Sequence, residues 1–258
     1  MSPTLNQVLV LMRRSVVRVI RSPAIVAQGI AFPLFLYAFN VGGLKLATKL
    51  PRFPTNSYET FALALTFAYC GIYATSVAGS QFGTDIGTGF VRRMTLTPVS
   101  SAVLLVGQLG GTVAFAVFQA IVYLVIGLAA GADVAAGPGG ALLIIGFGAL
   151  FGLAMGAVGL MVALLTRSGE AVQAAFPLLM TTLFFSSLNL PRDLIQTDWF
   201  QTVTTFNPIS YLVEAPRSLL ISGWDAQPLL LGAGVAAAIF VGAMIKTAGS
   251  LRALSVAR

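Results

Sequence analysis

Long apolar runs alternate with short polar segments along the whole chain. An α-helix needs roughly 20 apolar residues to cross a bilayer. The runs that approach this length cover residues 23–44, 58–82, 101–130, 140–165, 171–189 and 226–246. The run at 171–189 is the least regular, because Pro177 interrupts it. The pattern predicts an all-α membrane protein with six transmembrane helices, forming a single domain over residues 1–258.

The segment before the first run, residues 3–21, predicts an amphipathic helix. Its apolar residues recur at helical spacing on one face: Leu9, Met12, Val16, Val19 and Ile20. Its basic residues form a second stripe: Arg13, Arg14, Arg18 and Arg21. Such a helix lies along an anionic membrane surface and contacts membrane lipids. The alternative is the charged start of a signal peptide, but the apolar run that follows is longer than that of a signal peptide and lacks a clean small-residue cleavage site.

A polar island, GTDIGTGFVRRMTLTPVS at residues 83–100, separates the second and third runs. It carries Asp85, Arg92 and Arg93, and its 84–98 portion predicts a short helix. Six spans place both termini on one side of the membrane. With that side inside, ten of the 15 lysines and arginines fall in inner segments, which favours cytoplasmic termini and a cytoplasmic island.

A second unusual segment, residues 190–222, is too apolar for a free loop and too polar for a full span. It mixes aromatic side chains such as Trp199 with prolines and charges. We expect a helical hairpin that re-enters the membrane from the outer side, with its turn at Asn207-Pro208. Glu214 and Arg217 are spaced i, i+3 and are expected to pair. The alternative is an interfacial loop anchored by tryptophans.

Composition narrows the class of protein. Of the 258 residues, 57% are hydrophobic and only 9% are charged, against about 25% in soluble domains, and the mean hydropathy is +0.90. The net charge of +7 is therefore explained by membrane topology rather than by nucleic-acid binding. The chain has no histidine and a single cysteine, Cys70, so we expect no disulfide and no metal site.

Chemistry that would power transport from within the chain is missing from the sequence. There is no Walker A motif, so the chain is not expected to bind ATP. A secondary carrier or channel is the alternative, but carriers use ionisable groups near the membrane midplane, where these runs have none. A membrane-embedded enzyme would depend on Asp193, Asp198 or Glu214. Energy is therefore expected to come from another subunit acting on the island at residues 83–100.

The fourth run contains a stripe of small residues that is expected to serve helix packing. Gly152, Gly156 and Gly159 are spaced i, i+4, i+7. Small residues let membrane helices approach closely. Packing inside the bundle is favoured over a face for a second chain.

Three pieces of the chain together resemble the type-2 ABC exporter permeases, in particular the daunorubicin-resistance-type branch. They are the arginine-rich surface helix leading through Ser22-Pro23 into the first run, the island GFVRRMTLTPVS at 89–100, and the motif FNPISYLVEAPR at 206–217. The last piece matches the family's N-P-x-x-Y-x-x-E-x-x-R pattern at Asn207, Pro208, Tyr211, Glu214 and Arg217. Members of this family often carry an acidic residue shortly before the basic pair. Here the island departs from that pattern, because the nearest acidic residue is Asp85, and Gly89 and Phe90 stand between it and the arginine pair.

The resemblance implies a non-catalytic permease subunit in the cell membrane. A separate ABC subunit would bind ATP and Mg²⁺, and a second permease chain, identical or paralogous, would complete the pore. The transported compound would be hydrophobic or amphipathic (a drug, lipid or glycolipid) and would leave the cytoplasm or inner leaflet.

The resemblance also assigns roles to residues. The contacts with the ATP-binding subunit would be Asp85, Phe90, Arg92, Arg93 and Met94, and the 206–217 motif would form an outer gate or structural motif. The alternative for the two neighbouring arginines is anchoring to anionic headgroups. Candidate substrate-path residues are Phe61, Tyr69, Phe184 and Phe185, for which core packing or lipid contact is the alternative.

Overall fold

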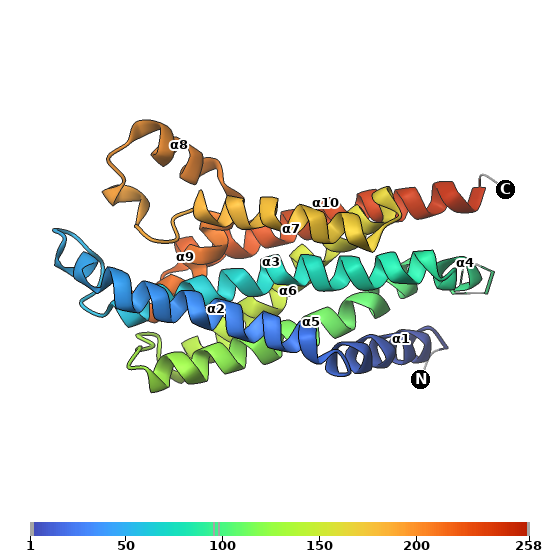
Figure 1. Ribbon diagram of the computed structural model, residues 1–258, viewed down its shortest axis with the longest axis horizontal. Coiled ribbons are helices and arrows are strands. Elements are labelled where there is room, and N and C mark those ends of the chain that lie inside the picture. The colour runs from blue at the N-terminus through green and yellow to red at the C-terminus, as the bar shows by residue number, and fades with distance from the viewer. Residues whose placement is uncertain (1–2, 95, 98, 257–258) are drawn as a thin grey trace.

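The computed structural model describes residues 3–94, 96–97 and 99–256, most of them helical. The long helices lie side by side in an elongated bundle (Figure 1). Within the described residues, five helices are long and apolar enough to cross a membrane. These are α2 (Pro23–Leu44), α3 (Tyr58–Gly87), α5 (Ser101–Ala129), α6 (Gly137–Thr166) and α10 (Ala226–Val256). They correspond to five of the six predicted spans.

The remaining predicted span, residues 171–189, is not confirmed. Helix α7 covers Gly169–Phe184, which is 16 residues with Pro177 inside. At 1.5 Å per residue it is about 24 Å long, short of the roughly 30 Å hydrocarbon core. The chain from 185 to 190 is irregular. The apolar run therefore continues past the end of the helix.

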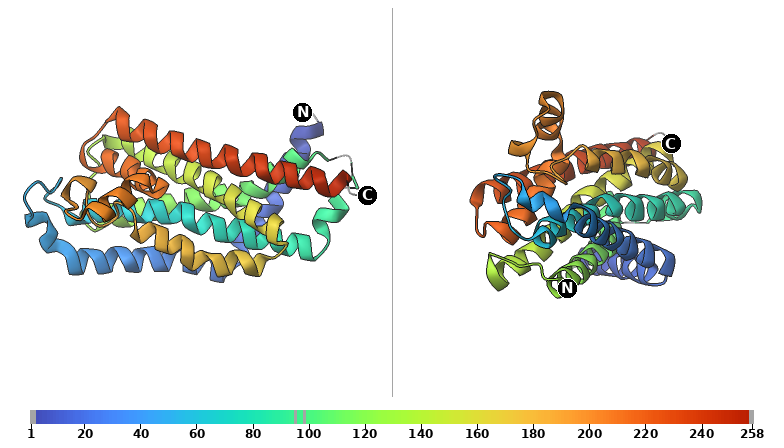
Figure 2. Two further views of the ribbon diagram at one scale, coloured as in Figure 1. Left: turned by 90° about the horizontal axis from the view of Figure 1, so that it is seen from above. Right: turned by 60° about the vertical axis from the view of Figure 1, so that its left-hand side comes forward.

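Shorter helices lie at the two ends of the bundle. They are α1 (Pro3–Ile20), α4 (Phe90–Met94), α8 (Asp198–Phe206) and α9 (Pro208–Ile221), with 3₁₀ turns η1 (Lys45–Lys49) and η2 (Arg192–Leu194). In Figure 1, α1, α4 and the end of α10 share one end, which we call the α4 end; α8 lies at the other, the α8 end. The left view of Figure 2 shows α1 running across the direction of the long helices. The start of α1 and the end of α10 thus lie at the same end of the bundle.

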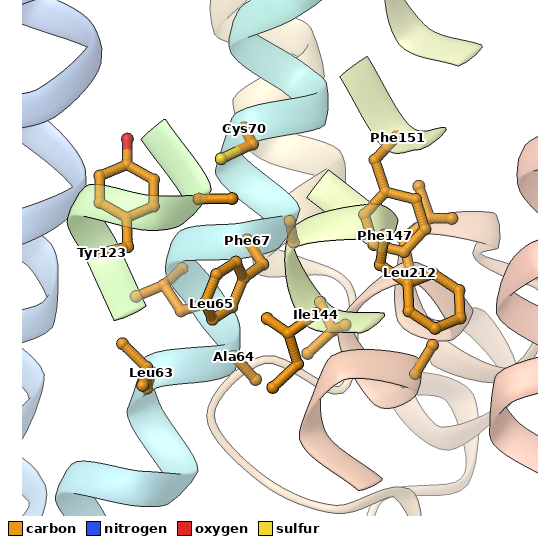
Figure 3. Packing of buried hydrophobic residues seen from close by; sticks show 14 of the residues in the cluster. Leu63, Ala64, Leu65, Phe67, Cys70, Tyr123, Ile144, Phe147, Phe151 and Leu212 are labelled. Atoms are coloured by element: carbon orange, nitrogen blue, oxygen red, sulfur yellow. The ribbon is translucent and has the colours of Figure 1, made fainter. Parts of the chain in front are cut away.

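Helix α3 forms the centre of the bundle. Its whole apolar window is buried inside the protein. Figure 3 shows Phe67 and Cys70 of α3 between Tyr123 of α5 and the α6 residues Ile144 and Phe151. Because aromatic and aliphatic side chains from α3, α5, α6 and α9 interlock here, α3 is held from several sides.

The glycines of α6 provide close helix contacts inside the bundle. A Cβ at Gly152 would lie 2.5 Å from the Ala116 Cβ of α5, and one at Gly159 would lie 2.2 Å from the Thr75 backbone oxygen of α3. Gly156 is likewise buried between these helices. The prediction that this stripe packs internally is confirmed.

Candidate functional site

A buried carboxylate at the α4 end connects three helices. Asp85 lies in the last turn of α3 and is only 2% exposed. Arg14 of α1 donates to its two carboxylate oxygens, at 2.9 and 2.7 Å, and Arg18 donates at 2.9 Å. Gln108 of α5 adds a hydrogen bond of 3.2 Å. The carboxylate is therefore neutralised by α1 and hydrogen-bonded to α5.

Arg14 also contacts α4. Its guanidinium carbon lies 3.9 Å from the ring centroid of Phe90, within cation–π range. The hydrogen bond with Asp85 raises the pKa of Arg14 above its ordinary value, so the group remains charged. One side chain therefore joins α1, the end of α3 and the start of α4.

The base of this junction is the contact between α1 and α5. Ser15 is buried and its hydroxyl donates to the Gln108 backbone oxygen at 2.8 Å. Glycines of α5 permit the approach: a Cβ at Gly107 would lie 2.4 Å from Leu11, and one at Gly111 would lie 2.4 Å from the Ser15 hydroxyl. Helix α1 is thus seated on the protein as well as being amphipathic.

These contacts divide the predicted basic stripe of α1. Arg13 and Arg21 are exposed. Arg14 and Arg18 instead turn toward Asp85. The expectation that all four arginines form a lipid-facing stripe is wrong for this pair, because a buried carboxylate on α3 is a closer partner than the membrane surface.

The predicted coupling helix is shorter than expected. Its helical part is Phe90–Met94, and Asp85 belongs to α3 rather than to it. Arg92 and Arg93 are exposed, and Arg93 donates to the Thr88 backbone oxygen at 3.2 Å. Phe90 and Met94 are half-buried. Residues 95 and 98, within the predicted range of 84–98, lie outside the described residues.

At the α8 end, Asn207 ties the start of α9 to the end of α7. Its side-chain oxygen accepts from the Ile209 amide at 2.9 Å and so caps α9, with Pro208 as the first helical residue. Its amide nitrogen donates to the Thr182 and Phe185 backbone oxygens, at 2.6 and 2.9 Å. One side chain therefore serves two helix termini.

Arg217 supports the irregular chain after α7. It is 7% exposed, and its two terminal nitrogens donate to the Ser187 and Leu188 backbone oxygens, each at 2.6 Å. Its guanidinium carbon lies 3.9 Å from the ring centroid of Phe61. These bonds give hydrogen-bond donors to backbone oxygens of the buried residues Ser187 and Leu188, which lie outside any regular helix.

Glu214 pairs with Arg192 of η2. The Arg192 Nε donates to the Glu214 Oε1 at 2.7 Å, and a second bond joins Nη2 to Oε2. The hydrogen bonds with Glu214 raise the pKa of Arg192. The guanidinium also lies 4.4 Å from the Tyr211 ring centroid, and Tyr211 donates to the Thr205 backbone oxygen at 2.9 Å.

The predicted pair between Glu214 and Arg217 is therefore wrong. The i, i+3 spacing is correct, but Arg217 points inward to backbone carbonyls while Glu214 reaches the 190–197 linker. Sequence reasoning missed Arg192 because it lies 22 residues from its partner, in a segment without periodic pattern. The pair borders an open cavity of about 630 Å³ that also includes Asp193 and Asp225.

The substrate-path candidates separate into two groups. Phe61 and Tyr69 are buried in the core, where Phe61 lies beneath Arg217 and Tyr69 stacks on Tyr73 with ring centroids 5.7 Å apart. Phe184 and Phe185, at the end of α7, are exposed. Core packing thus accounts for the first two. No group of three potential metal ligands occurs among the described residues.

The five long apolar helices of the bundle indicate a multi-pass membrane protein. Residues 6–221 match the family model described as ABC-2 type transporter, and the chain belongs to this family. It is accordingly the permease component of an ABC transporter. A comparison with curated proteins finds no match.

Proposed function

We propose that the chain is the permease subunit of an ATP-driven exporter of the daunorubicin-resistance type. A separate ATP-binding subunit hydrolyses ATP, and a second permease chain completes the pore. The exported compound is hydrophobic or amphipathic. The observation that best supports the proposal is the Arg14–Asp85–Phe90 junction, because it joins a short exposed helix to the membrane helices.

Force applied at α4 would reach the bundle through this junction. Arg92 and Arg93 offer exposed positive charge for contact with the ATP-binding subunit. Phe90 transmits displacement of α4 to Arg14, and Arg14 transmits it to α1 and, through Asp85, to α3. Since α3 is buried along its length, it cannot shift without moving its neighbours. Helix α4 thus acts as a coupling helix.

The placement of charges supports the proposed orientation and substrate class. The α4 end carries the arginines of α1, α4 and the α6–α7 turn, so we place it, and both termini, in the cytoplasm of a cell-membrane protein. The middle parts of the five long apolar helices carry no charged residue. An apolar or amphipathic compound fits such surroundings better than an ion. The exposed apolar sides of α2 and α10 are available to lipid or the second permease chain.

The test is Arg92→Ala/Arg93→Ala in the permease reconstituted with its ATP-binding subunit. We expect ATP-dependent transport, or retention of the ATP-binding subunit, to fall at least about tenfold, which corresponds to ~1.4 kcal/mol, while membrane insertion stays normal. Lys49→Ala/Arg52→Ala removes the same charge at the opposite end and should leave both quantities unchanged. Undiminished transport in the first variant, or transport by the permease alone, would overturn the proposal.

A further inference from the structure

An apolar groove lies at the elbow where α1 turns into α2. It has a volume of about 390 Å³, within the range of small-molecule sites. Its lining comes from α1, α2 and α5: Val16, Val19, Ile20, Val26, Gly111, Ala114, Phe115 and Phe118. Val19 and Phe115 form its buried floor, while Ile20 and Phe118 are 69% and 46% exposed at its rim. The groove is therefore open to the surroundings of the protein.

The shape of the chain explains why the groove exists. Helix α1 runs across the bundle and α2 runs along it, as the left view of Figure 2 shows. The direction changes at Ser22, between Ile20 and Pro23. Because α1 and α2 point in different directions where they cross α5, they leave a wedge-shaped space over α5. The small residues Gly111 and Ala114 of α5 make this space deeper. Apolar walls at this position face the boundary between headgroups and acyl chains if α1 follows the membrane surface.

Two exposed arginines of α1 lie beside the groove, and neither has an acidic partner among the described residues. Arg13 precedes the lining residue Val16 by three positions, so the two share a side of α1. Arg21 directly follows the lining residue Ile20. Asp85 neutralises only the other two arginines of α1.

We propose that this groove binds one acyl chain of an anionic phospholipid, whose headgroup is held by Arg13 and Arg21. The proposal depends on the orientation of α1 along the membrane that the proposed function assumes, but not on the transported compound or on ATP. Lipid supplies both an apolar chain for the walls and a phosphate for the arginines.

A second copy of the chain is a poorer occupant. The partner would have to bring acidic side chains to Arg13 and Arg21. At the α4 end, the exposed acidic side chain among described residues is Glu170, which stands close to Arg167 in the sequence, and Asp85 is buried. The other acidic residues belong to the α8 end or its loops. Charge complementarity therefore favours the membrane.

The experiment measures lipid retained by the full-length permease. The protein is exchanged into nanodiscs of equal parts palmitoyl-oleoyl phosphatidylglycerol and phosphatidylcholine, released into mild detergent, and examined by native mass spectrometry. We expect one retained lipid per chain, enriched in phosphatidylglycerol. Ala114→Trp fills the groove from an exposed position and should abolish retention. Ala38→Trp is the matched control: Ala38 is exposed on α2, about 18 Å along that helix from the lining residue Val26, so this variant should retain the lipid.

Charge variants test the headgroup. Arg13→Gln and Arg21→Gln should each lower the preference for phosphatidylglycerol about fivefold, equivalent to ~1 kcal/mol, while Arg52→Gln should not. Retention by Ala114→Trp equal to that of the unaltered protein would overturn the site. Equal retention of the two lipids would overturn the anionic headgroup. Dissociation of a permease dimer by Ala114→Trp, without a change in retained lipid, would assign the groove to a second copy instead. Because none of these readings involves ATP, their failure is distinct from failure of the proposed function.

Discussion

Arg14 and Asp85, 71 residues apart in the chain, form a two-point ion pair in which both carboxylate oxygens accept from the guanidinium. The carboxylate is buried and the guanidinium is about one-third exposed. The pair occupies the place where the transverse helix α1 meets the end of α3. It makes α1 part of the bundle, so that a disturbance of α1 reaches the central helix.

Replacing the carboxylate should release α1. We expect Asp85→Asn to destabilise the protein by about 2 kcal/mol, less than for a fully buried pair because both arginines keep contact with solvent. The measurement is thermal unfolding in detergent, together with protease sensitivity of α1. Glu170→Gln, an exposed acidic residue at the same end, is the control and should change neither. An Asp85→Asn protein as stable as the unaltered one would show that the contacts of α1 with α5 hold it in place without the ion pair.

The linker before α8 should depend on the Arg192–Glu214 pair. Both side chains are about one-fifth exposed, so we expect a coupling energy of about 1 kcal/mol in a double-mutant cycle of Arg192→Gln and Glu214→Gln. The cycle is measured by thermal unfolding. The same cycle for Glu214 and Arg217 is the comparison, and its coupling should be smaller because those side chains point apart. The reverse ranking would restore the i, i+3 pair suggested by the sequence.

Local patterns in the sequence predict most of the helices. Hydropathy alone predicts α2, α3, α5, α6 and α10, because a helix that crosses lipid must be apolar along its length. Periodicity predicts α1, and the Asn207-Pro208 pair predicts the boundary between α8 and α9. Whether the segment from 190 to 222 enters the membrane stays a prediction.

Contacts that join distant segments are beyond such patterns. The apolar character of residues 185–189 suggests that the helix continues. Instead the helix ends there, and the side chains of Asn207 and Arg217 donate hydrogen bonds to the backbone oxygens that the helix would otherwise use. Likewise, the arginines of α1 resemble a lipid-facing stripe until Asp85 is placed beside them. The partner of a buried polar group is whichever side chain the fold brings close to it. The spacing of residues along one helix does not reveal that side chain.

Arg217 should be sensitive even to a conservative replacement. Lysine keeps the charge but presents a single nitrogen, so it cannot donate to the Ser187 and Leu188 oxygens in the geometry of the planar guanidinium. We expect Arg217→Lys to cost about 2 kcal/mol, since a buried carbonyl loses its donor. Unfolding temperature and hydrogen exchange at residues 185–190 provide the readout. Arg52→Lys, at an exposed arginine, should leave both unchanged; an equal effect of the two replacements would rule out a special role for the guanidinium.

Two glycines of α6 offer the sharpest test of the packing. A Cβ at Gly159 would approach the Thr75 backbone oxygen to 2.2 Å, and backbone cannot move aside as a flexible side chain does. Gly159→Ala should therefore push α6 away from α3 and destabilise the protein by about 2 kcal/mol, within the cost range of overpacking. At Gly146, on the same helix, nothing lies within 4 Å of an added Cβ. Gly146→Ala should be neutral, or stabilise by up to about 1 kcal/mol through its higher helix propensity. Thermal unfolding of the two variants side by side measures the difference, and equal stabilities would contradict the close contact between α3 and α6.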